Sequence, residues 1–355
     1  MWMEIFMASP ESEIHNQIGN NTEDAKFYSG WSEWLISNLV AGSHLEDILE
    51  VMRQSGFSDE YAGARLRESA QNPVVKGARD AVAVQRKAAD ILNALSKLEH
   101  KSPFSKQVNV VRNLAAADFY REYFFKNRPV VLQGITSKWK AVGLWTPEHF
   151  ASRFGDCQVE VTAGRESDPE HEYNLDQHKR QMPMRDYVRL VVDGGETNDY
   201  YLVAQNYLLA RPEFQELYDH ITDLDGYLDA SDVRGRVRVW FGPKGTITRL
   251  HHDTVPVLMA QIYGRKQVKL ISPVHLSSVS SDGDWLSSLD LDHLDYSRFP
   301  KMQNVDVLEV TLAPGELLFV PLGWWHWVKA LDVSISVSLD NFCVPRNEIE
   351  MDRRR

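Results

Sequence analysis

The sequence predicts a mainly β domain, a sandwich or a barrel of the jelly-roll kind, preceded by an α-helical N-terminal region. Up to about residue 105, apolar residues recur every three or four positions, as they do along one face of a helix. From about residue 130 the period changes to two, in short segments separated by glycine and proline. Many short strands with tight turns and few helices between them are typical of sandwiches and barrels.

Two apolar stripes indicate the helices of the N-terminal region. Ser43 and Glu46 have the spacing of a capping box, and Gly56 indicates the end of the helix that they begin. The first stripe consists of Leu45, Ile48, Leu49 and Met52, and the second of Val84, Ala88, Ile91, Leu92, Leu95 and Leu98. Ordinary packing is the simpler interpretation of both stripes, and dimerisation or substrate docking is the alternative. Because the segment 100–106 resembles a linker, we expect a helical region over residues 1–105 and a second domain over residues 106–355.

The second domain contains a series of segments that we expect to form strands. They are RPVVLQG, CQVEVTA, YYLVAQN, RVRVWFG, VPVLMAQIYG, KQVKLISP, DVLEVTL, ELLFVPL and VSISVSLDNF. In the last of these, the odd-numbered positions from Val333 to Leu339 are apolar and the even-numbered positions from Ser334 to Asp340 are polar. This alternation predicts a strand with one buried face and one exposed face.

Composition argues against several classes of function. The formal charge is −11 at pH 7, whereas binding to nucleic acid or to an anionic membrane needs a basic surface. Cys157 and Cys343 lie in unrelated contexts, without the spacing of a zinc finger or a disulfide framework. No apolar run approaches the roughly 20 residues of a membrane span, and the N-terminal MWMEIFMASPESE lacks the basic start of a signal peptide. We therefore expect a cytoplasmic protein that binds neither nucleic acid nor membranes.

The segment TRLHHDT, at residues 248–254, predicts part of a metal site. Successive side chains of a strand point to opposite faces, so His251 and Asp253 can bind one ion while His252 points away. Two histidines and one carboxylate form the facial triad that holds iron(II) and leaves positions open for a co-substrate and O₂. The His-x-Asp spacing alone is weak support, because it is common by chance.

A candidate third ligand lies in LAPGELLFVPLGWWHWV, where His326 is surrounded in sequence by Trp324, Trp325 and Trp327. By itself, a histidine in so apolar a segment is more often a hydrogen-bonded core residue than a ligand. Next to a His-x-Asp pair in a β-rich chain, the ligand interpretation becomes the stronger one.

Two further polar residues stand where apolar ones are expected. Lys266 shares a strand face with Val268 and Leu270, although a lysine on an apolar face needs an anion as its partner. A bound dicarboxylate would supply that anion, and a bulge that returns the side chain to solvent is the alternative. Asn341 continues the apolar side of the last strand, where a buried amide needs a partner from a ligand or from the backbone.

Together, the segments WFGPKGTITRLHHDTVPVLMAQIYGRKQVKLISP, LAPGELLFVPLGWWHWVKAL and VSLDNF resemble the JmjC-type, cupin-like iron(II)- and 2-oxoglutarate-dependent oxygenases. The similarity extends from about residue 119 to about residue 343. It is strongest to the hydroxylase branch that contains factor-inhibiting-HIF and the small JmjC-only arginyl hydroxylases. The ordered agreement of His-x-Asp, of Lys266 fifteen residues after His251, and of PGE, FVP and WWH is highly specific. Residues 1–105 show no such resemblance.

The resemblance implies a double-stranded β-helix and a set of site residues within a JmjC/cupin-like catalytic domain over residues 106–355. His251, Asp253 and His326 would hold iron(II), and Lys266 would bind the distal carboxylate of the co-substrate, 2-oxoglutarate. Further co-substrate contacts are implied for Thr248, Tyr201 and Asn341, and substrate contacts for Trp240 and Glu160.

Two positions depart from the family pattern. Val257 stands where an asparagine near the metal is usual, which removes one hydrogen-bonding group from the co-substrate pocket. Cys343 stands where a tryptophan is often found, which is expected to widen or reshape the substrate wall.

The implied activity is that of a dioxygenase that uses O₂ to hydroxylate an amino-acid side chain in a protein or peptide, with release of succinate and CO₂. Three alternatives stay open: hydroxylation of a free amino acid or natural-product scaffold, the activity of a JmjC demethylase, and a metal-binding scaffold without turnover. The expected partner is therefore a protein, peptide or amino-acid substrate, and a homodimer through the helical region is a further expectation.

Overall fold

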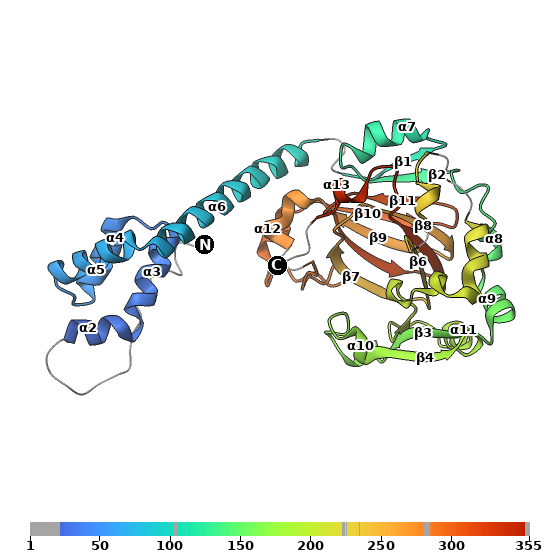
Figure 1. The fold of residues 1–355 in the computed structure, drawn as a ribbon, viewed down its shortest axis with the longest axis horizontal. Coiled ribbons are helices and arrows are strands. Elements are labelled where there is room, and N and C mark those ends of the chain that lie inside the picture. Colours follow the sequence, from blue (N-terminus) through green and yellow to red (C-terminus); the bar gives the residue numbers. More distant parts are fainter. Residues whose placement is uncertain are drawn as a thin grey trace. The chain divides into compact units, whose positions relative to one another are not determined.

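The computed structural model of the 355-residue chain describes residues 22–102, 106–221, 224, 226–233, 235–279 and 285–351. The chain divides into two compact units, Met1–Ala94 and Leu95–Arg355 (Figure 1). The N-terminal segment MWMEIFMASPESE, which is not expected to be a signal peptide, lies outside the described residues, and so do residues 103–105 of the expected linker. Within the described part of the chain, no helix combines the length and hydrophobicity that a membrane span requires.

The first unit is helical, as its apolar periodicity predicts. It contains α2 (Thr22–Lys26), a π-helical turn (Phe27–Trp31), α3 (Ser32–Ala41), α4 (Leu45–Gln54), α5 (Asp59–Gln71) and most of α6 (Pro73–His100). The predicted capping box is wrong, because α4 begins at Leu45 and the Ser43 hydroxyl donates to Asn38 Oδ1 instead. Ile48 and Met52 of the first stripe are fully buried, and Gly56 follows the helix end with φ +86°.

The second stripe does not follow the simpler packing interpretation. Val84 is 71% exposed and Ile91 is 53% exposed, and Val75 is the buried residue of α6 among those described. A homodimer through this helix stays a prediction. The last residues of α6, from Leu95 onward, belong to the second unit, where Ser272 Oγ donates to Glu99 Oε2 over 2.9 Å.

Two sheets form the centre of the second unit. The larger has the order β1-β2-β11-β8-β13-β6 and the smaller the order β10-β9-β12-β7. Their strands are β1 (Asn109–Arg112), β2 (Val130–Gln133), β6 (Val237–Gly242), β7 (Ile247–His252), β8 (Val257–Tyr263), β9 (Lys266–Ile271), β10 (Val307–Leu312), β11 (Leu317–Val320), β12 (Trp325–Ala330) and β13 (Ser334–Leu339). From β6 to β9 and again from β10 to β13 the chain passes back and forth between the two sheets, so strands distant in sequence become neighbours.

Helices and a third sheet surround these strands. The third sheet has the order β4-β3-β5, with β3 (Gln158–Ala163), β4 (Lys179–Pro183) and β5 (Tyr200–Tyr201). The helices are α7 (Ala116–Phe119), a π-helical turn (Tyr120–Phe124), α8 (Ala141–Leu144), α9 (Pro147–Phe154), α10 (Leu175–His178), α11 (Met184–Asp193), α12 (Leu276–Val279) and α13 (Arg346–Ile349). Short 3₁₀ turns span Arg165–Ser167, Ala204–Asn206, Leu208–Ala210, Pro212–His220, Ala230–Asp232, Pro273–His275 and Pro300–Asn304. The expectation of few helices between the strands is therefore wrong.

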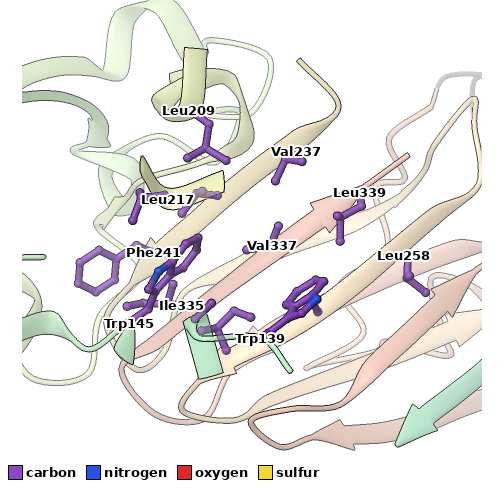
Figure 2. Packing of buried hydrophobic residues seen from close by; sticks show 14 of the residues in the cluster. Trp139, Trp145, Leu209, Leu217, Val237, Phe241, Leu258, Ile335, Val337 and Leu339 are labelled. Atoms are coloured by element: carbon purple, nitrogen blue, oxygen red, sulfur yellow. The ribbon is translucent and has the colours of Figure 1, made fainter. Parts of the chain in front are cut away.

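Residues of α7, α8, α9 and α11 pack on the larger sheet, whereas Val279 of α12 packs with Trp325 and Trp327 of the smaller sheet. Ile335 and Val337 of β13 pack with Trp139, Trp145 and Phe241 in the main hydrophobic cluster (Figure 2). The opposite face of β13 is buried as well, since Ser334 and Ser336 have no exposed surface. The prediction of a half-exposed final strand is therefore wrong: its apolar face meets the helical connections, and its serine face is turned toward the smaller sheet.

The two-sided burial of β13 predicts a large cost for truncation of its apolar face. Ile335→Ala should lower the free energy of unfolding by about 2–5 kcal/mol, because it leaves a cavity in a packed cluster. The matched control is Val110→Ala at a 56% exposed strand position, which should stay within about 0.5 kcal/mol of wild type. Urea denaturation measures both changes; equal midpoints for the two variants would contradict this description of β13.

Candidate metal centre

His251 and His326 are brought together by strand pairing. β7 and β12 are antiparallel neighbours in the smaller sheet, and His251 lies directly opposite His326. Their ring centres are 4.0 Å apart, and Asp253 follows immediately after the end of β7. One nitrogen from each histidine and one carboxylate oxygen of Asp253 lie within 4.8 Å of one another. The three residues that the sequence selects therefore converge in a cluster that could hold one ion.

The hydrogen bonds of both histidines leave the same ring nitrogen for a metal. His251 Nδ1 lies 2.8 Å from the carbonyl of Arg249, and His326 Nδ1 lies 3.2 Å from the carbonyl of Trp324. A carbonyl only accepts, so each Nδ1 carries the proton and donates it. Each Nε2 then keeps its lone pair, and His326 Nε2 lies 3.6 Å from Asp253 Oδ2. This backbone fixation of the tautomer is typical of metal-binding histidines.

Burial keeps His326 neutral at physiological pH. Its side chain is almost inaccessible to solvent, and the loss of hydration lowers the pKa of the imidazole to about 4. The neighbouring His251 lowers the pKa further, whereas the charge of Asp253 opposes the shift. A neutral imidazole is the form that binds a metal ion.

His252, Trp325 and Trp327 lie on the other face of the sheet, whereas Trp324 packs with Leu270 and Val328. The rings of His252 and Trp325 are 4.6 Å apart, and Trp325 packs with Leu250 and Trp327. Side chains alternate between the two faces of a strand, so Trp325 and Trp327, like His252, point away from the ligand cluster. These two rings therefore do not surround His326. Trp285, 6.0 Å from His251 in an edge-to-face contact, is an aromatic neighbour that sequence reasoning missed.

Thr248 reaches the same face as His251 because of a bulge. In a regular strand, residues three apart point to opposite faces. The pairing of β7 with β12 shifts by one residue, so that His326 opposes His251 while Val328 opposes Thr248. Since His326 and Val328 share a face, Thr248 and His251 share one as well. Simple alternation could not have predicted this placement.

Lys266 is buried inside the second unit, and the alternative of a solvent-exposed lysine is wrong. Its side chain is 2% exposed, and its Nζ donates to Tyr201 Oη and to Ser336 Oγ, each over 2.8 Å. Among the described residues no carboxylate makes an ion pair with it. An ammonium group buried with two neutral hydroxyls is poorly compensated, which is the condition expected of an anion-binding group. Ser336 is a member of this cluster that sequence reasoning missed.

The lysine and the ligand cluster belong to one face of the smaller sheet. Leu270 of β9 lies opposite His326, and Lys266 lies four residues earlier on the same strand. At about 3.3 Å per residue, the backbone of Lys266 is therefore about 13 Å from that of Leu270, the residue opposite His326. Tyr201 is also buried, and its ring lies 5.7 Å from that of Trp240, whose Nε1 donates to Ser338 Oγ.

Asn341 and Glu160 have other partners. Asn341 Nδ2 donates to the carbonyl of Asp229 over 2.9 Å, and its buried Oδ1 has no hydrogen-bond partner within the described part of the chain. The Glu160 carboxylate accepts from Gln181 and pairs with Lys179 at 3.6 Å, and Glu160 and Lys179 both line a small hollow. Among the described residues, no hydrogen bond or ion pair connects Asn341 or Glu160 to the ligand cluster, so both roles stay predictions.

The two departures from the family pattern also have defined positions. Val257 is the first residue of β8 and is half-buried, opposite Val320 of β11. Cys343 is exposed and follows the final strand, where its Sγ lies 3.5 Å from the carbonyl of Gly226. Their effect on the pocket remains a prediction.

Comparison with known proteins supports the interpretation of this domain. A family described as the cupin-like domain matches residues 116–340, which is more than half of the chain. The chain is 30% identical over 225 residues to lysine-specific demethylase 8 of Xenopus tropicalis, covering 62% of this chain and 49% of the relative. It is 28% identical over 255 residues to lysine-specific demethylase JMJ30 of Arabidopsis thaliana, covering 70% of this chain and 57% of the relative. JmjC domain-containing protein D of Dictyostelium discoideum is 27% identical over 244 residues, which cover 62% of this chain and 53% of that protein. The chain thus spans about half the length of the curated relatives that it matches.

The cluster predicts which substitutions weaken metal binding. His251→Ala and Asp253→Ala should each lower the affinity for iron(II) or manganese(II) at least tenfold, because each removes one of three ligands. His252→Ala, one residue away on the opposite face, is the matched control and should bind like wild type. Titration calorimetry under argon gives the affinities; wild-type affinity in Asp253→Ala would show that the ion is held elsewhere.

The lowered pKa of His326 predicts a loss of stability in acid. A histidine titrates near pH 6.5 in the unfolded chain and near pH 4 in the folded protein, so the unfolded state binds the additional proton between these values. The metal-free protein should therefore lose up to about 3 kcal/mol between pH 6.5 and pH 4, and nothing from this group above pH 7. His326→Phe should flatten that part of the profile, as measured by urea denaturation at each pH; an unchanged slope would show that His326 is not the group responsible.

Proposed function

We propose that this chain, which belongs to the cupin-like domain family, is an iron(II)- and 2-oxoglutarate-dependent dioxygenase. The observation that carries the proposal is the buried Lys266, which lacks a carboxylate partner among the described residues and lies on the same sheet face as the His251, Asp253 and His326 cluster. A metal-binding scaffold without turnover does not need a buried lysine beside its metal. An enzyme that binds a dicarboxylate beside its metal needs one.

The donor set fits iron(II). Two neutral imidazole nitrogens and one carboxylate are the ligands of the facial triad, which leaves coordination positions open. Bound iron(II) would supply the oxidative decarboxylation of 2-oxoglutarate by O₂, which yields succinate, CO₂ and a hydroxylated substrate. The alternation of strands between the two sheets further supports a double-stranded β-helix of the jelly-roll kind around this centre.

The chain's own residues would bind and orient the co-substrate. Lys266 would form a charge-assisted hydrogen bond to the distal carboxylate, with the hydroxyls of Tyr201 and Ser336 beside it. Thr248 shares the face of His251 and is placed to add a hydroxyl contact. The apolar residues of the same face, Val268 and Leu270, are fully buried and would exclude water from the reacting atoms.

The substrate that we propose is an amino-acid side chain in a protein or peptide. Trp240, next to Tyr201, is the pocket residue best supported by contacts, and Glu160 and Asn341 remain candidates. Two of the relatives are named lysine-specific demethylases, so demethylation is a second candidate function beside hydroxylation. Oxidation of a free amino acid or natural-product scaffold is a third, and the cytoplasmic location remains an expectation.

Turnover distinguishes the enzyme from a scaffold. Protein supplied with iron(II), ascorbate and 2-oxoglutarate should form succinate, and Asp253→Ala should abolish this activity. Lys266→Met should raise the co-substrate KM at least tenfold with metal affinity unchanged, because it removes the charge that binds the distal carboxylate. Lys269→Met, on the opposite face of β9, is the matched control. No succinate with any candidate substrate would contradict the proposal, as would an unchanged KM in Lys266→Met.

A further inference from the structure

The strand that carries the candidate ligand His251, β7, is an edge strand of the smaller sheet. β7 pairs with β12 on one side, so its other edge must find hydrogen-bond partners elsewhere. Near the ligand cluster the partner is backbone: His252 N donates to the Trp285 carbonyl over 3.0 Å, and Ser287 N donates to the Leu250 carbonyl over 2.8 Å. The ligand end of β7 is therefore held by a short stretch of strand-like pairing.

The opposite end of β7, beside Lys266, is held by side chains. Ile247 N donates to Asn198 Oδ1 over 2.8 Å, and the Ile247 carbonyl accepts from Arg165 Nη2 over 2.8 Å. Two residues further on, Arg249 N donates to Glu172 Oε1 over 3.1 Å. These three side chains come from the segment between β3 and β5, which does not itself pair with β7.

Arg165 differs from the other two because it is a buried cation on which the carboxylates of Glu172 and Asp199 act only at longer range. Its side chain is 3% exposed, and no carboxylate of the described residues makes an ion pair with it. Its Nη2 also donates to His171 Nε2 over 3.0 Å; His171 Nδ1 faces the Asp168 carbonyl, so Nε2 is the accepting nitrogen. Its Nε and Nη1 are buried without a hydrogen-bond partner within the described part of the chain.

The guanidinium also packs on the tyrosine that contacts Lys266. Arg165 Cζ lies 5.3 Å from the centre of the Tyr201 ring, whose hydroxyl accepts from Lys266 Nζ. Another side of this ring lies against Gly242, where a Cβ would approach ring atom Cδ2 to 2.6 Å. Gly242 and Arg165 thus restrict the position of the Tyr201 ring. The position of the ring in turn determines where the Tyr201 hydroxyl meets the ammonium group of Lys266.

We propose that Arg165 is a positioning residue for the dicarboxylate site: it holds the Tyr201 ring and the Ile247 end of β7, and thereby sets the Tyr201 hydroxyl against Lys266. The inference rests on the proposed function, because it presupposes that Lys266 binds an anionic carboxylate. The positive charge of Arg165 acts in the same direction, since an anion at Lys266 is stabilised by a second buried cation behind the tyrosine. The ligand end of β7 has its own backbone pairing, so metal binding should depend little on Arg165.

The test measures metal and co-substrate binding separately, without turnover. In protein loaded with manganese(II), Arg165→Met should raise the Kd for 2-oxoglutarate about tenfold and leave the Kd for manganese(II) within about twofold of wild type. Arg153→Met, an exposed arginine on α9, is the matched control and should change neither value. A Kd for 2-oxoglutarate within twofold of wild type in Arg165→Met would overturn the proposal, as would equal losses of metal and co-substrate affinity.

A double-mutant cycle shows whether Arg165 acts through Tyr201. In a Tyr201→Phe background, Arg165→Met should weaken 2-oxoglutarate binding clearly less than it does in wild type, because the hydroxyl that it positions is gone. Fully additive effects would overturn the proposed route. If Arg165→Met does not fold, Arg165→Lys replaces it: a lysine keeps the charge but cannot span both contacts, so a threefold or larger rise in Kd is expected and an unchanged Kd refutes the proposal.

Failure of this inference can be told apart from failure of the proposed function. If wild-type protein binds manganese(II) but no 2-oxoglutarate, and Lys266→Met behaves identically, both the proposed function and the positioning role of Arg165 are overturned. If Lys266→Met loses 2-oxoglutarate while Arg165→Met retains it, only the role of Arg165 is overturned.

Discussion

The ammonium group of Lys266 is the constraint on which the rest of the site depends. It is buried on β9 beside the apolar residues Val268 and Leu270 of the same strand face, and hydroxyl groups from β5 and β13 are its partners. Placing a charge there is costly unless an anion compensates it. The surrounding structure accommodates this arrangement: β13 turns its serines rather than its apolar residues toward the lysine, and helices cover the apolar face that this orientation leaves.

The candidate ligands are organised by the same pairing of strands. His251 and His326 meet because β7 and β12 are neighbours in register, and their Nδ1 atoms are bound by carbonyls only two residues away. A single bulge in β7 places Thr248 beside them. The edge of β7 is supported by backbone near the ligands and by side chains near Lys266, so the two halves of the site have separate supports. This separation is why we expect metal affinity and co-substrate affinity to respond differently to substitution.

Local sequence patterns predicted the parts of the site that depend on alternation along one strand. His251 and Asp253 together, His252 apart, and an inward-facing Lys266 all follow from a period of two. The patterns failed where a second element decides the outcome. Whether Ser336 faces solvent or Lys266 depends on what covers β13. The face to which the Thr248 side chain points depends on a bulge that forms only when β7 pairs with β12. Arg165 is distant in sequence from Tyr201 and from Lys266, and no periodicity could have connected it to either residue. The apolar stripe of α6 shows the converse, since Val84 and Ile91 have the spacing of packed residues and are exposed.

The central claim is that one metal ion and one dicarboxylate share the inner face of the smaller sheet. A crystal structure of the protein soaked anaerobically with manganese(II) and 2-oxoglutarate tests it most directly, with anomalous scattering to locate the ion. We predict one manganese ion bound by His251 Nε2, His326 Nε2 and the Asp253 carboxylate, with the distal carboxylate of 2-oxoglutarate on Lys266 Nζ. An ion bound by other residues, or a Lys266 that keeps only its bonds to Tyr201 and Ser336 while 2-oxoglutarate lies elsewhere, would contradict the account.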